Sequence, residues 1–140
     1  MNIKYKKISF VAEINLNSNS AYKHQVLKMC DAFSQKGFNV NLFIINTNNF
    51  TFSKVKKSHL LKKNFKITQI FKSFKKLNFF SRLLFAYKVF IKTKKDKNSI
   101  VYGRSIITCI FFSILKKNNV LEIHQPNSGI TKFLFNLFKK

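Results

Sequence analysis

The sequence predicts an α/β fold in which helices cover both faces of a doubly wound parallel sheet. Short apolar runs alternate with helical patterns along the chain, and the second apolar run is too apolar for a strand with one face in water. The segment between the first two runs is long enough for a crossover helix. The 140 residues allow one domain, 1–140, with one core, and a single Pro and three Gly mark no linker.

The first third of the chain predicts a strand, a helix and a second strand. Ile8 to Ala12 is short and apolar, as buried strands are. A helix from about Ser20 to Lys36 follows, because Ser is a good N-cap and Gly37 provides a C-terminal stop. Val40 to Ile45 is the second strand, and turn-forming Asn residues follow it.

The remaining elements continue the alternation. Phe65 to Ile70 is a candidate third strand. The apolar side chains at 80, 83, 84, 87 and 91 recur at helical spacing and predict a helix from about Asn78 to Lys95. After it we expect, in order, a strand Ser99–Tyr102, a helix Ser105–Lys116, a strand Asn119–Ile123 and a helix Ile130–Phe138.

The charge of the chain is strongly positive, with a formal net charge of +23. Arg82 and Arg104 are arginines, so the other 25 of the 27 basic residues are lysines. An AT-rich genome favours Lys, Asn, Ile and Phe codons but does not deplete acids, and only four acids are present. Part of the charge therefore reflects a basic surface suited to anionic lipid headgroups or phosphorylated ligands. Nucleic acid is the less favoured partner, because its readers prefer the bidentate fork of Arg.

One lysine-rich segment, Lys54 to Lys76, mixes nine lysines with apolar residues. It is either an amphipathic surface that lies on anionic lipid or the solvated face of an ordinary core segment. The N-terminal apolar run is too short for a signal peptide, and Ile106 to Leu115 is about half as long as a membrane span. These features predict a cytoplasmic protein that can sit peripherally on the inner face of the membrane.

The candidate site follows from the predicted fold, because ligands of doubly wound sheets gather outside the carboxyl ends of the strands. Glu13 and Glu122 fall at such ends, and Arg104 follows another strand. If those last two strands are neighbours, Arg104 and Glu122 can form a pair that fixes the next loop, or one that only neutralises itself at the sheet edge. His124 lies in that loop, where an imidazole can bind a hydroxyl or phosphate or exchange a proton.

Other sequence signals are weak or missing. His24 and His59 lack a strand-end position and are expected to be surface or packing residues. Cys30 and Cys109 form no metal-ligand or redox motif and are expected to be buried thiols, so we expect no metal site. Neither a GxGxxG nor a Walker loop occurs, and GxSxG and HExxH are also missing.

Four segments of the sequence, ISFVAE, FSQKGFNVNLFII, SIVYGRS and NVLEIHQP, resemble the N-terminal domain of family 4 glycosyltransferases. The YGRS and EIHQP elements carry most of this resemblance. It implies a Rossmann-like sheet that forms the N-terminal half of a GT-B fold. It also implies sugar transfer from a nucleotide-sugar substrate to a glycan or lipid-linked acceptor, with no cofactor and no obligatory metal.

The resemblance also implies roles for individual residues. His124 matches the crevice histidine that contacts the transferred sugar and is the catalytic candidate. The substrate-binding candidates are Glu13, Asn17, Ser18, Arg104, Glu122 and Gln125. Many members have Gly-Gly in the loop after the first strand, whereas this chain has Asn17-Ser18-Asn19-Ser20, which weakens the case for phosphate contact there.

The donor-binding domain of that family, with its paired glutamates, has no counterpart in these 140 residues. We therefore expect an acceptor-side fragment or one half of a split enzyme, inactive alone. A donor domain or second subunit is expected at the apolar segment Phe133–Phe138. The alternatives are a non-catalytic basic module that binds anionic membrane or nucleic acid by charge, and a relic without activity.

Overall fold

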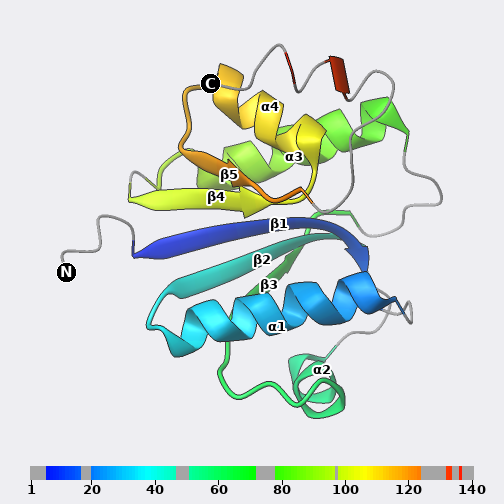
Figure 1. The fold of residues 1–140 in the computed structure, drawn as a ribbon, viewed down its shortest axis with the longest axis vertical. Coiled ribbons are helices and arrows are strands. Elements are labelled where there is room, and N and C mark those ends of the chain that lie inside the picture. The colour runs from blue at the N-terminus through cyan, green and yellow to red at the C-terminus, as the bar shows by residue number, and fades with distance from the viewer. Residues whose placement is uncertain are drawn as a thin grey trace.

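The computed structural model describes residues 6–16, 20–46, 51–71, 78–96 and 98–123, together with 132, 133 and 136. Their centre is a five-stranded sheet in the order β3-β2-β1-β4-β5, with every neighbouring pair parallel (Figure 1). The elements along the chain are β1 (Lys7–Asn15), α1 (Ala21–Gln35), β2 (Asn39–Asn46), α2 (Phe52–Ser58), β3 (Lys66–Gln69), α3 (Phe79–Thr93), β4 (Ser99–Gly103), α4 (Ile106–Ile114) and β5 (Asn119–Leu121).

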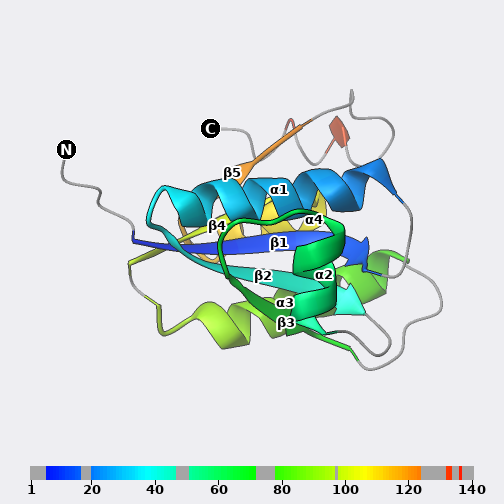
Figure 2. The same cartoon turned by 90° about the horizontal axis from the view of Figure 1, so that it is seen from below.

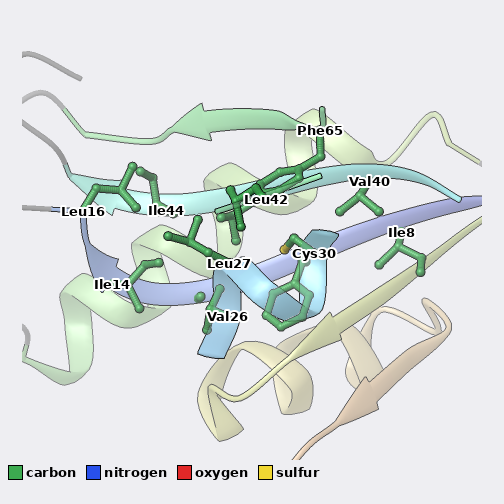
Figure 3. Close-up of a cluster of buried hydrophobic side chains, with 13 residues drawn as sticks. Ile8, Ile14, Leu16, Val26, Leu27, Cys30, Val40, Leu42, Ile44 and Phe65 are labelled. Atoms are coloured by element: carbon green, nitrogen blue, oxygen red, sulfur yellow. The ribbon is translucent and has the colours of Figure 1, made fainter. Parts of the chain in front are cut away.

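Helices cover both faces of this sheet, as the sequence predicts for a doubly wound fold. α1 and α2 lie on one face, and α3 and α4 lie on the other (Figures 1 and 2). Two apolar clusters fill the layers between helices and sheet. In the first, Leu27 and Cys30 of α1 pack among residues of β1 and β2 (Figure 3). In the second, Phe85 of α3 and Phe112 of α4 pack on the opposite face.

Helices α1, α3 and α4 begin at polar caps that the sequence supplies. The Ser20 hydroxyl accepts a hydrogen bond from the Lys23 backbone N–H, and the Ser105 hydroxyl accepts one from Thr108. Asn78 and Ser81 form a reciprocal capping box at the start of α3. After α1 the chain turns at Gly37, whose φ of 87° lies in the region that favours glycine.

The structure differs from the sequence prediction at three places. α2 was not expected, because only seven residues form it and its apolar side chains that contact the core are Phe52 and Val55. β1 extends to Asn15, three residues beyond the predicted end. β5 ends at Leu121, two residues before the predicted end. The helix predicted over 130–138 falls largely outside the described residues.

Four apolar side chains of the lysine-rich segment face inward, whereas Leu60 is exposed. Leu61 and Phe65 are buried in the α1-side core, and Val55 and Ile67 pack against it. Because these side chains are used in the core, they are not available to enter a bilayer. This part of the segment therefore favours the alternative of a solvated lysine face around a core segment.

The strand order reverses between β1 and β4, which places the expected ligand crevice at the carboxyl ends of these two strands. The two backbones approach closely there. A Cβ atom on Gly103 would lie 3.0 Å from the Val11 carbonyl oxygen, so glycine allows the strands to pair at this point. Arg104 and Ser105 come directly after Gly103 and lie at the carboxyl edge of the sheet, near the end of β1.

Candidate functional site

The described site candidates gather at the carboxyl edge of the sheet. Glu13 lies near the end of β1, Arg104 follows β4, and Glu122 follows β5. β4 and β5 are neighbours, which is the condition under which the sequence predicts an Arg104–Glu122 pair. The other four candidates, Asn17, Ser18, His124 and Gln125, lie outside the described residues, so their contacts remain predictions.

Arg104 and Glu122 form a bidentate ion pair. Arg104 Nε donates to Glu122 Oε2 at 2.9 Å, and Nη2 donates to Oε1 at 2.8 Å. The Tyr102 hydroxyl adds a 3.2 Å hydrogen bond to Oε2. The side chains of Arg104 and Glu122 are 6% and 19% exposed, so the pair is largely screened from water. Parallel N–H···O bonds of this kind fix orientation as well as charge.

Helix α1 holds the outer side of the same guanidinium. Arg104 Nη1 donates to the Gln25 Oε1 atom at 3.0 Å, and Nη2 lies 3.3 Å from the Met29 sulfur. The guanidinium carbon lies 5.2 Å from the centre of the Tyr22 ring. The three residues of α1 are spaced i, i+3 and i+7, so they share the helix face that is turned toward Arg104.

Tyr22 connects this pair electrostatically with Glu13. Burial is the main cause that raises the pKa of Tyr22 to about 12; Arg104 opposes the rise, and Glu13 and Glu122 add to it. The phenol therefore stays protonated at neutral pH and can donate a hydrogen bond. The pKa of Tyr102 is raised as well, first by burial and then by Glu122.

Glu13 belongs to a second cluster at the same edge, whose other members come from α3 and from the start of α4. The Ser105 hydroxyl donates to Glu13 Oε1, and Arg82 Nε of α3 lies 3.2 Å from Oε2 without the alignment of a hydrogen bond. The Glu13 side chain is 13% exposed. The contacts thus tie β1 to the start of α4 and to α3. They bring Glu13 near the point where the strand order reverses but pair it with Arg82 rather than with Arg104.

Sequence reasoning missed four groups that build this edge: Tyr22, Gln25, Met29 and Arg82. It included Tyr102 and Ser105 only as members of the YGRS element, without a role for either side chain. A signal for the α1 residues existed, since their i, i+3, i+7 spacing marks one face of the helix that follows β1. No sequence signal links Arg82 to Glu13, because the partners lie 69 residues apart and on different elements. The arrangement is a polar wall of paired charges and a protonated phenol, which suits positioning of a polar ligand.

The remaining titratable candidates lie elsewhere. His24 of α1 and His59, which follows α2, contact each other with their Nδ1 atoms 2.9 Å apart. Burial, followed by the charges of Lys23, His24 and Lys28, lowers the pKa of His59. This ring contact agrees with the packing role that the sequence predicts for both residues.

The two cysteines are free and buried. Burial raises the pKa of Cys109 to about 12 and raises that of Cys30 further. Across the described ranges, no three His, Cys, Asp or Glu side chains gather in a group that could hold a metal ion. In the same part of the chain, no helix has the length and apolar character needed to cross a bilayer.

Comparison with known proteins gives one informative likeness. No model of a protein family matches the chain, and no curated protein matches it. Among solved structures, it is similar to one described as "Crystal Structure Analysis of the Glycotransferase of kitacinnamycin", with a TM-score of 0.50 and 5% identity over 84% of this chain. The match spans 30% of the length of that protein's chain. The chain therefore has a Rossmann-like α/β fold similar to part of a glycosyltransferase.

Proposed function

We propose that this chain is the acceptor-side, N-terminal domain of a family 4 glycosyltransferase of the GT-B type. In this role it binds a glycan or lipid-linked acceptor, while a donor-binding domain supplied by further polypeptide holds the nucleotide-sugar. The observation that carries the proposal is the polar wall of Arg104, Glu122 and Tyr22 beside the point where the strand order reverses. The fold likeness to a glycosyltransferase supports the same assignment.

Each described residue has a role that its contacts support. Glu122 holds Arg104 in one orientation, and α1 holds the outer edge of the guanidinium through Gln25. The Tyr22 phenol, which is protonated at neutral pH, supplies a hydrogen-bond donor for a sugar hydroxyl. We propose that His124, placed by the sequence just after Glu122, contacts the transferred sugar.

A binding experiment on the intact chain tests the acceptor side of this proposal. Amide shifts are recorded by NMR during titration with a panel of octyl glycosides and, separately, with UDP and GDP. We expect glycosides to shift the amides around Glu13, Tyr22 and Arg104, and the nucleotides to leave them in place. A nucleotide that shifts these amides while every glycoside fails would refute the acceptor-side assignment.

Two single variants show whether a loss of glycoside binding comes from the polar wall or from a general change in the protein. Arg104→Met should weaken glycoside binding at least tenfold, because it removes the guanidinium N–H donors that hold Glu122 and Gln25 in place. The control His59→Asn removes a side chain that contacts His24 and not Arg104, so it should bind like the wild type. Once a donor domain is supplied, His124→Ala should abolish transfer, and full activity of that variant would rule out its assigned role.

A second candidate function is binding of an anionic surface by charge alone. The observation in its favour is that all four acids of the chain are engaged by internal partners, and one of them, Asp96, pairs with a lysine, Lys7, so most of the positive charge has no carboxylate to neutralise it. Such binding should weaken steeply between 50 and 500 mM salt. Salt-insensitive binding would exclude it.

A further inference from the structure

Helix α3 carries an exposed apolar stripe on the side turned away from the sheet. We call it the α3 stripe; its members are Phe80, Leu84, Tyr87 and Ile91, which are 77%, 46%, 51% and 42% exposed. Their spacing of i, i+4, i+7 and i+11 aligns them along one face of the helix. The opposite face carries Phe85 and Val89, which are fully buried against the sheet. α3 is thus apolar on two faces, and the fold covers one of them.

Lysines border the α3 stripe, and no acid lies on α3. Lys88 and Lys92 follow one side of the stripe along the helix, and Lys95 lies in the turn after it. All three are exposed, although the Lys88 ammonium also lies 4.5 Å from the centre of the Phe71 ring. The nearest acid in sequence, Asp96, is bound to Lys7 at 2.7 Å. Arg82, the arginine of α3, is directed to Glu13. Among the described residues, the charged groups that border the stripe are therefore basic.

This combination of apolar and basic groups identifies the occupant by its chemistry. A second copy docked on the stripe by a two-fold axis would bring lysine rims together with no carboxylate between them. Protein interfaces generally are enriched in Arg and depleted of Lys, the reverse of what borders this stripe. An anionic bilayer fits both features, because acyl chains accept the apolar side chains while lysine stems extend their ammonium groups to lipid phosphates.

We propose that α3 is a membrane-surface helix that inserts the α3 stripe into the interface of an anionic bilayer. At 15 residues, or about 22 Å, it lies in the plane of the surface instead of crossing it. The inference rests on the exposure and charge of α3 and is independent of any sugar transfer. It also places the membrane contact on α3 and not on the lysine-rich segment, where Val55, Leu61, Phe65 and Ile67 are used in the core.

A tryptophan reporter tests the insertion directly, because the chain contains no Trp. Tyr87→Trp is mixed with vesicles of phosphatidylcholine containing 30% phosphatidylglycerol, and its emission is recorded with and without brominated lipid. We expect a blue shift and quenching by the brominated chains. The matched control is Leu60→Trp, since Leu60 is 78% exposed and follows α2 on the other face of the sheet. We expect it to show neither change.

Charge insertion tests the energetic role of the stripe. Leu84→Asp and Ile91→Asp should each lower vesicle partitioning about tenfold or more, because each removes one buried apolar side chain from the interface. Leu60→Asp should partition within twofold of the wild type. All three positions are exposed, so circular dichroism should report an unchanged fold for each variant.

Two results would overturn the proposal. Wild-type partitioning of Leu84→Asp and Ile91→Asp would mean that lysines bind the vesicle through charge elsewhere on the molecule. Sedimentation that shows a wild-type dimer, dissociated by Leu84→Asp, with no vesicle binding, would assign the stripe to a second copy. Neither result bears on the acceptor-side function, because these vesicles contain no sugar donor or acceptor.

Discussion

The Arg104–Glu122 pair provides the sharpest energetic test of the polar wall. The perturbation is a double-mutant cycle with Glu122→Gln, Arg104→Met and the combined variant. Glu122→Gln keeps the size of the side chain but leaves the guanidinium, which is 6% exposed, without its countercharge. Removing one partner of a fully buried pair costs about 3–5 kcal/mol. Glu122 retains 19% exposure, so water offsets part of this loss and we expect about 2–4 kcal/mol.

The coupling energy is the decisive quantity. Because the pair is bidentate and screened, we expect a coupling of about 2 kcal/mol from urea unfolding followed by circular dichroism. The Lys7–Asp96 pair is the internal control, since its side chains are 37% and 30% exposed. The cycle Lys7→Met with Asp96→Asn should give about 1 kcal/mol or less, as exposed pairs do. A coupling below about 0.5 kcal/mol for Arg104–Glu122 would refute the view that this pair organises the edge.

Three further predictions concern stability and reactivity. Burial alone would raise the pKa of Asp31, but the N–H groups of Lys63 and Lys62, the Gln35 amide and Lys28 outweigh it and lower that pKa. The charged Asp31 thus stabilises the fold at pH values above the ordinary Asp pKa, and this stabilisation is lost as the pH falls and the carboxylate is protonated. Asp31→Asn should therefore lower the free energy of unfolding, measured by urea titration, by about 1–3 kcal/mol at pH 7 and by less at pH 3. Gly103→Ala should lower the free energy of unfolding by about 1–3 kcal/mol in the same assay, because the added methyl group would lie 3.0 Å from the Val11 carbonyl oxygen. An unchanged urea midpoint would show that β1 and β4 can move apart without loss of stability. Cys30 and Cys109, buried with raised pKa values, should react with a thiol reagent only after unfolding, and rapid labelling of the native chain would contradict their burial.

The fold was largely predictable because its signals are local. Ser20, Asn78 and Ser105 cap helices where the sequence predicts helices to begin, and apolar runs set the strands. The Arg104–Glu122 contact was predictable as well, given that consecutive strands of such sheets are often neighbours. α2 escaped prediction because a seven-residue helix spans two turns and gives little periodicity.

The orientation of helices was not predictable in the same way. The spacing of Leu84, Tyr87 and Ile91 predicts α3 correctly, yet these residues are exposed and Phe85 and Val89 form the packed face. A helix that is apolar on two faces gives no pattern from which to choose its buried face. The contact of Gln25 with Arg104 depends on how α1 is rotated on the sheet, which is set by packing of the whole layer.

The position of β1 in the centre of the sheet has a consequence for the order in which the molecule folds. Ile8 pairs with Val40 on one side and with Ile100 on the other, so the two pairings close loops of very different length. Because distant closures carry the larger entropic cost, the β1–β2 half should form before β4 docks. The carboxyl edge then assembles late, since it needs β4, β5 and α1 together, and a chain arrested midway would expose one side of β1 as an unpaired strand edge.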